Sequence, residues 1–156
     1  MLDRLARLCA VLACVLLTAI ALTTCVSLVG RNLMGWALAG DFELAGAAAG
    51  AAIALFMPWC QLRRGHISVG FFTAHASEAM QSRLERLGAL LLALAFALLA
   101  WRTGVGALGA WRSGAGSMLL GVPEWVVQAA MVPPLALTAL IGLAQVLRAA
   151  AFVDGA

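Results

Sequence analysis

The sequence predicts an all-α integral membrane protein with four transmembrane helices and almost no soluble part. Apolar residues make up 64% of the 156 residues and charged residues only 11%, and the mean hydropathy is +1.01. A soluble domain needs about a quarter of its residues charged to cover its wetted surface. The apolar residues also form long blocks rich in Leu and Ala instead of alternating with polar ones. This pattern favours a helix bundle over a β-barrel.

The first predicted span covers residues 8–29. Arg4 and Arg7 precede it, as in a secretory signal. Its apolar run is longer than the core of a signal peptide, however, and further spans follow. We therefore expect an uncleaved first helix.

The second predicted span covers residues 42–62. Asp41 is the expected N-cap, and Glu43 places an anion in the first turn, where the helix dipole favours it. Pro58 should kink this helix or mark its last turns.

The third predicted span covers residues 84–108. Ser82 and Glu85 have the spacing of a capping box. The apolar run from residue 87 to residue 101 is shorter than the roughly 20 residues that a span needs, so we expect the helix to continue past Arg102. The Arg102 side chain would then either snorkel to the interface or face a partner.

The fourth predicted span covers residues 123–147. Pro123 suits the first helical position, and Glu124 suits the first turn. Pro133 and Pro134 lie in mid-span, where they remove two N–H donors and should kink the helix.

The connection between the second and third spans predicts a short amphipathic helix on the cytoplasmic membrane surface. Apolar residues recur there every four positions, with polar residues between them. They are Phe72, Ala76, Met80 and Leu84.

The arginines predict the orientation, since the chain has ten basic residues and all of them are Arg. Seven fall on one side of the predicted spans: Arg4, Arg7, Arg63, Arg64, Arg83, Arg86 and Arg148. Three fall on the other: Arg31, Arg102 and Arg112. The positive-inside rule then places both termini in the cytoplasm.

Small residues on the second span predict close helix packing. Gly46 and Gly50 form a GxxxG pair that Ala54 extends, and such a stripe lets two backbones approach. The pattern does not say whether the partner helix is internal. Together with Pro133 and Pro134, these residues are the candidates for helix packing.

No reaction or transport site can be assembled from this sequence, so we predict no catalytic residue, cofactor or metal and no enzyme. The only histidines, His66 and His75, lie in one polar connection, and the four cysteines lack metal-ligand spacing. No Asp, Glu, Lys or His lies at the centre of a predicted span, where carriers usually hold such groups. This absence indicates a subunit that packs on a larger membrane protein.

Several short motifs resemble the small permease subunit of TRAP transporters, the tripartite ATP-independent periplasmic carriers. They are Arg31, an acid at Glu43, the Arg-Arg-Gly-His-Ile-Ser-Val run at 63–69, the Leu-Leu-Gly-Val-Pro-Glu-Trp run at 119–125, and Pro133-Pro134. The resemblance covers nearly the whole chain. Family members often carry two adjacent acids at the start of the second helix, whereas Phe42 separates Asp41 and Glu43 here.

The resemblance implies a scaffold role in a sodium-coupled importer of an organic acid in the bacterial inner membrane. A large permease subunit would hold the substrate and sodium sites, and a periplasmic substrate-binding protein would deliver the acid. The implied cytoplasmic motif is Arg63, Arg64, Gly65 and His66. Arg31, Arg112 and Glu124 would face the periplasm and help dock the binding protein. Phospholipids complete the expected partners.

Two alternatives belong to other classes of protein. One is the membrane anchor of a redox complex that holds haem or quinone, which the placement of the two histidines disfavours. The other is a small exporter that acts as a homodimer, which would need a carboxylate at mid-membrane.

Overall fold

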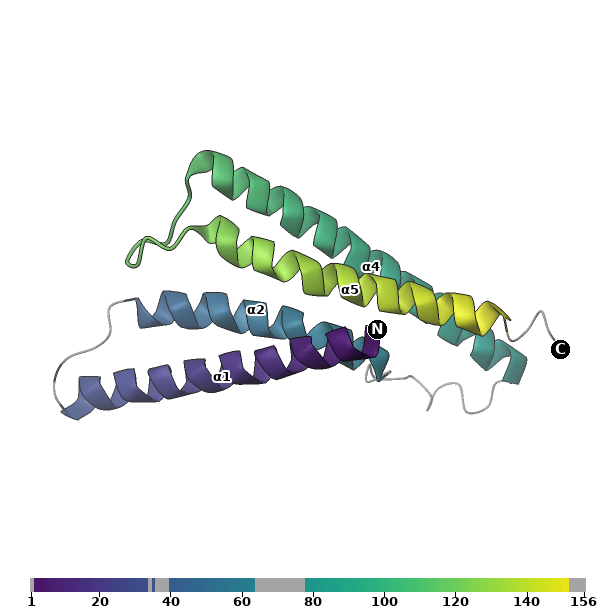
Figure 1. Cartoon of the computed structure of the whole chain (residues 1–156), viewed down its shortest axis with the longest axis horizontal. Coiled ribbons are helices and arrows are strands. Elements are labelled where there is room, and N and C mark those ends of the chain that lie inside the picture. The colour runs from purple at the N-terminus through teal and green to yellow at the C-terminus, as the bar shows by residue number, and fades with distance from the viewer. Residues whose placement is uncertain (1, 34, 36–39, 64–77, 152–156) are drawn as a thin grey trace.

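The computed structural model describes residues 2–33, 35, 40–63 and 78–151, and these fold into four long helices (Figure 1). They are α1 (Leu2–Leu33), α2 (Asp41–Leu62), α4 (Glu78–Ser113) and α5 (Glu124–Ala151). Each is long and apolar enough to cross a membrane. The predicted all-α fold with four transmembrane helices is therefore confirmed. The helices exceed the predicted spans by up to six residues at an end, and the part of each that lies in the bilayer stays a prediction.

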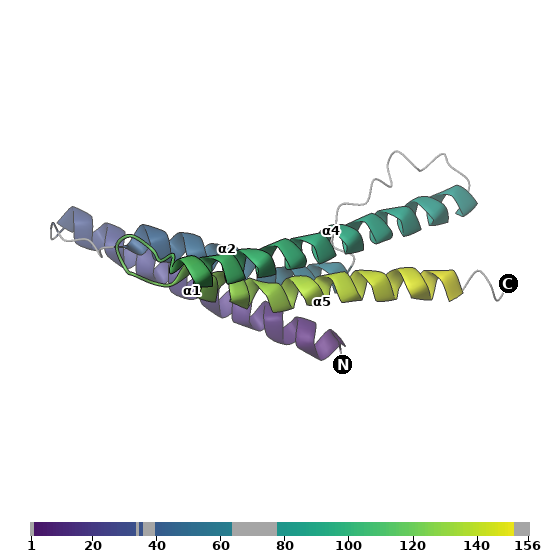
Figure 2. The same cartoon turned by 90° about the horizontal axis from the view of Figure 1, so that it is seen from above.

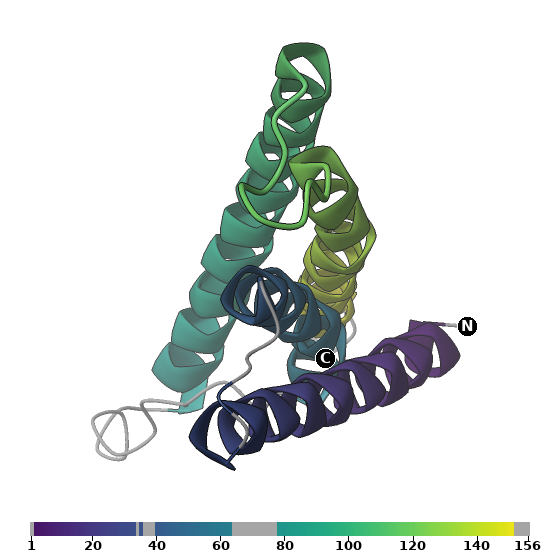
Figure 3. The ribbon, with the colours of Figure 1, turned by 90° about the vertical axis from the view of Figure 1, so that its left-hand side faces the viewer.

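Helix α2 lies at the centre of the bundle. Figure 3 shows α2 between α1 on one side and the α4–α5 pair on the other. It packs along both α1 and α5, and α4 packs along α5. Helix α1 begins and α5 ends toward one end of the bundle (Figures 1 and 2). At the opposite end, α1 finishes and α2 begins beside the α4–α5 connection.

The buried core is small and consists mainly of short side chains. Ala54 of α2, Ala100 of α4 and Leu135 of α5 form a buried cluster at the middle of the bundle. Small side chains let the three backbones approach closely. Only 6% of the most apolar stretch of α1 is buried inside the chain. Lipid or a partner protein must therefore cover most of its apolar surface.

Two helix starts differ from the predictions. Asp41 is the first helical residue of α2, and Gly40 takes the N-cap position in the left-handed conformation, with φ of +81°. The prediction of Asp41 as the N-cap is wrong, because its carboxylate bonds to α1 instead. The prediction of a capping box at Ser82 is also wrong. Helix α4 begins at Glu78, since residues 78–81 are good helix formers.

The prolines lie within continuous helices. Helix α2 extends four residues beyond Pro58, and α5 is helical through Pro133 and Pro134. The Thr138 hydroxyl donates a hydrogen bond of 2.8 Å to the carbonyl oxygen of Pro134. Hydroxyls of membrane helices commonly bond to their own backbone in this way.

Most of the predicted amphipathic helix lies outside the described residues, because it depends on positions between 64 and 77. Its end, from Glu78 onward, forms the first turns of α4.

Candidate functional site

The most developed polar site lies where α1 ends, α2 begins and α4 turns into α5. We call it the end junction, and define it by Ser27, Arg31, Asp41, Glu43 and the loop 114–123. The Ser27 hydroxyl donates a hydrogen bond to the Asp41 carboxylate. The Arg31 guanidinium lies 3.8 Å from the same carboxylate. Asp41 therefore joins α2 to the last turns of α1.

Glu43 joins α2 to the α4–α5 loop. Its carboxylate accepts hydrogen bonds from the backbone N–H of Met118, at 3.1 Å, and of Leu119, at 3.2 and 3.3 Å. Backbone N–H groups that converge on an anion are strong partners, since the acceptor is charged. The two acids of α2 thus point to different neighbours, one to α1 and the other to the loop.

The loop is held internally as well as by Glu43. The Ser117 N–H donates to the Val122 carbonyl at 2.9 Å, and the Gly121 N–H donates to the Ser117 carbonyl at 3.1 Å. Despite this fixed backbone, the side chains at its tip face outward: Met118 is 98% exposed and Leu119 is 67% exposed.

Gly40 brings α2 against this loop. A Cβ atom at this position would come within 2.5 Å of Leu120 Cγ. Two features of this position favour glycine: the left-handed φ, and the close approach of Leu120.

The three predicted docking residues all lie at this end of the bundle. Arg31 is in the last turn of α1, Arg112 in the last turn of α4 and Glu124 in the first turn of α5. Of the three, Arg31 takes part in the end junction. Trp111 and Trp125 are the sequence neighbours of Arg112 and Glu124, and the centres of their rings lie 6.0 Å apart.

At the opposite end, two arginines meet one tryptophan. The guanidinium carbon of Arg7 lies 5.6 Å from the centre of the Trp59 ring, and that of Arg63 lies 4.7 Å from it. These are cation–π distances. Arg63 is the one member of the predicted cytoplasmic motif within the described residues, since Arg64, Gly65 and His66 fall outside them.

A pair of glutamines links α2 and α5 near the same end. Gln61 Nε2 donates to Gln145 Oε1 at 3.1 Å, and Gln145 Nε2 donates to the Gln61 carbonyl at 2.9 Å. Gly142 lies beside the pair, where a Cβ atom would come within 3.1 Å of Ala93 Cβ on α4. Side-chain amides are common cross-links between membrane helices.

The small-residue stripe of α2 lies partly against α5. A Cβ atom on Gly50 would come within 2.6 Å of Met131 Cε, and Ala54 belongs to the central cluster. A Cβ atom on Gly46 would have nothing within 4 Å. Of the two prolines, Pro134 is buried and Pro133 is exposed.

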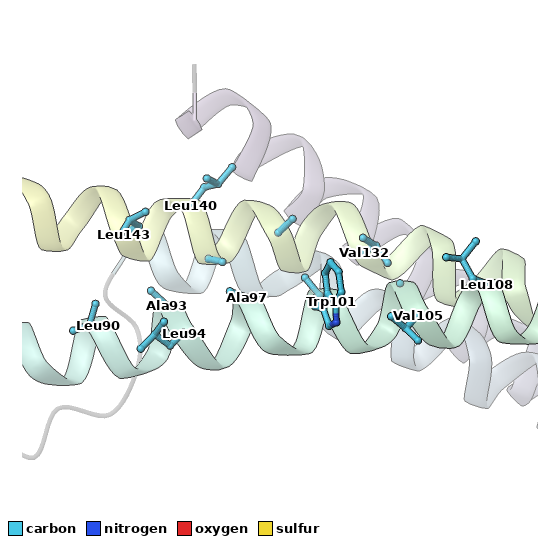
Figure 4. A pocket seen from close by; sticks show the side chains of 14 residues that line it. Leu90, Ala93, Leu94, Ala97, Trp101, Val105, Leu108, Val132, Leu140 and Leu143 are labelled. Carbon is cyan, nitrogen blue, oxygen red and sulfur yellow. The ribbon is translucent and has the colours of Figure 1, made fainter.

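An apolar groove of about 720 Å³ runs between α4 and α5. Figure 4 shows Leu90 and Leu94 on α4 and Leu140 and Leu143 on α5 along its walls. Its walls present almost no polar atoms, so they offer nothing to orient a polar solute. Among the described residues, no group of three His, Cys, Asp or Glu side chains could hold a metal ion.

These features define a class: a small multi-pass membrane protein whose polar contacts join its helices to one another. The comparison with protein families gives the particular assignment. Residues 20–152 match the family described as Tripartite ATP-independent periplasmic transporters, DctQ component. The chain therefore belongs to this family, which is the small membrane component of TRAP transporters. No curated protein and no solved structure matches the chain.

Sequence reasoning missed the contacts of the end junction. No motif in the sequence pairs Ser27 with Asp41, and the loop at 117–119 carries no polar motif that points to Glu43. Glu43 lies 75 residues from Met118 in the sequence. The separated acids were the only signal, because residues two positions apart on a helix face different neighbours.

Proposed function

We propose that this chain is the non-catalytic small membrane subunit of a sodium-coupled TRAP transporter. It scaffolds the large permease subunit and helps dock the periplasmic substrate-binding protein, so that the complex takes up an organic acid. The observation that carries the proposal is the distribution of its groups among the described residues: the outer surface is extensively apolar, and the acids of α1, α2 and α5 stand in the first turn of each helix. The family assignment supports a partner role in the same complex.

The helix interiors support a scaffold better than a carrier. Ion-coupled carriers hold carboxylates or unwound polar backbone near mid-membrane. In α1, α2 and α5 the acids stand in the first turn, and both histidines lie outside the described residues. The sodium and substrate sites then belong to the large permease.

The proposed orientation puts both termini in the cytoplasm of a bacterium and the end junction at the periplasmic side of the inner membrane. The arginine distribution supports this orientation. Arg4, Arg7 and Arg63 lie at the end opposite the junction, where α1 begins and α2 ends.

The end junction is then the docking face for the binding protein. Charges of both signs surround the loop, supplied by Arg31, Arg112 and Glu124. Complementary charges raise the association rate and the specificity of such contacts. Helix α1, the Gly46–Gly50 stripe and the proline-containing α5 supply contacts within the membrane.

Co-expression with the large permease tests the proposal. We expect the two proteins to co-purify in mild detergent, and we expect deletion of this chain to abolish sodium-dependent uptake by cells. Full uptake without this chain, or a permease that never retains it, would contradict the scaffold role.

A further inference from the structure

Arg102 stands well inside a membrane-spanning helix. It lies in α4, eleven residues before that helix ends at Ser113. At a rise of 1.5 Å per residue, this places it about 16 Å along the helix from that end. The candidate span in α4 runs from Arg86 to Ser113, so Arg102 is close to its middle.

Packing against the neighbouring helices gives the same depth. Two residues before Arg102, Ala100 meets Ala54 and Leu135 in the central cluster. Two residues after it, a Cβ atom on Gly104 would lie 3.9 Å from Val132 Cγ2. Leu135 and Val132 are near the centre of the α5 span, which runs from Glu124 to Leu147.

The Arg102 side chain is exposed on the outside of the bundle. No carboxylate among the described residues forms an ion pair with it. A helical side chain leans toward the N-terminus of its helix, and for Arg102 this direction leads away from the nearer end of the span. An arginine in hydrocarbon without a partner is costly, and one within a span usually faces another group that pairs with it.

A second copy of this chain has no acid at this depth. Two copies share one orientation in the membrane, and the acids lie near the helix ends or in the tail. They are Asp3, Asp41, Glu43, Glu78, Glu85, Glu124 and Asp154. Lipid phosphates lie at the membrane surfaces. An acid on another membrane protein at the same depth would supply the missing anion.

We propose that Arg102 pairs with an aspartate or glutamate that a transmembrane helix of the large permease subunit presents near mid-bilayer. This inference rests on the proposed function, because that function supplies the partner. The surrounding surface suits a helix: Leu98 is 63% exposed, Val105 is 48% exposed, and a Cβ atom on Gly109 would have nothing within 4 Å. Val105 also lines the apolar groove between α4 and α5.

The test is co-purification of the complex with R102L, R102K and the control R4Q, whose arginine is exposed at the start of α1. Removing one partner of a buried pair leaves the other charge uncompensated. We expect R102L to lower the affinity for the permease about tenfold or more. R102K keeps the charge but loses the planar guanidinium that can bind a carboxylate through two N–H groups. Its affinity for the permease should therefore lie between those of R102L and the wild type, and R4Q should bind like the wild type.

Photo-crosslinking identifies the partner independently of these variants. A benzophenone amino acid at Leu98, one turn toward the N-terminus from Arg102, should crosslink to a permease helix within one turn of an Asp or Glu. Crosslinks only to lipid or to a second copy would overturn the inference, as would R102L binding the permease like the wild type. If the wild-type chain itself fails to bind the permease, the proposed function fails as well; if it binds and R102L binds equally, only this inference fails.

Discussion

At the scale of single residues, two acids separated by one residue organise the end junction. The Asp41 carboxylate accepts a hydrogen bond from the Ser27 hydroxyl and lies near the Arg31 guanidinium. The Glu43 carboxylate accepts hydrogen bonds from two backbone N–H groups of the loop. One carboxylate thus holds α1 on one side of α2, and the other holds the α4–α5 connection on the other side. The loop can then present Met118 and Leu119 to a partner without prior ordering, which lowers the entropic cost of binding.

Replacing Glu43 should release the loop. In E43A, the backbone N–H groups of Met118 and Leu119 lose their acceptor, so we expect their hydrogen exchange to become at least about tenfold faster. E43Q keeps a neutral acceptor oxygen and should show a smaller increase. E124Q is the matched control, because it removes an acid at the same end of the bundle. Unchanged exchange in E43A would show that Glu43 does not hold the loop.

Gly40 tests the close approach between α2 and the loop. G40A combines an unfavourable φ with a clash against Leu120, and we expect a loss of about 1 to 3 kcal/mol in unfolding free energy. Gly35 has a similar φ of +67°, but a Cβ atom there would have nothing within 4 Å. G35A should therefore lose less unfolding free energy than G40A. Adding L120A to G40A should recover part of the loss. Equal losses in G40A and G35A, measured by denaturation in detergent, would argue against the contact.

At the scale of the helices, packing depends on where small residues face. Gly142 of α5 stands against Ala93 of α4 and beside Gln61 of α2, so one position brings three helices together. Gly46 of α2, by contrast, faces open space within this chain. The first position therefore serves the internal fold, and the second is available to another protein.

Leucine at these two glycines should separate the roles. We expect G142L to destabilise the isolated chain by about 1 to 3 kcal/mol, because the larger side chain forces α4 and α5 apart. G46L should leave the isolated chain unaffected but weaken co-purification with the permease. Denaturation of the isolated chain and pull-down of the complex measure the two effects. A stable G142L chain would contradict the packing described here.

The sequence predicted the elements better than their contacts. Long apolar blocks are visible without structural information, so four helices were predictable from composition and pattern alone. The start of α2 was not, because Asp41 bonds across to Ser27 instead of capping its own helix. The pairing of Gln61 with Gln145 joins residues 84 positions apart, and no local pattern encodes such a pair. Arg102 was recognised in the sequence, but its place beside the central cluster follows only from the packing of Ala100 with Ala54 and Leu135.

At the scale of the whole molecule, the chain buries little of its own apolar surface. Its four helices form a thin bundle with a core of small residues, and α1 is covered over only a small part of its length. Such a molecule gains much of its packing from lipid or from a larger partner. Several of its described polar groups connect helices to one another, and the groove between α4 and α5 is lined by almost no polar atoms.

Reconstitution of uptake tests the central claim, that this chain supports a carrier without being one. Proteoliposomes would contain this chain alone, the large permease alone, or both, with the binding protein outside and an inward sodium gradient. The labelled solute would be the organic acid that the binding protein retains on purification. We predict uptake only when both membrane proteins are present. Sodium-driven uptake by this chain alone, at a rate comparable to that of the complex, would contradict the account.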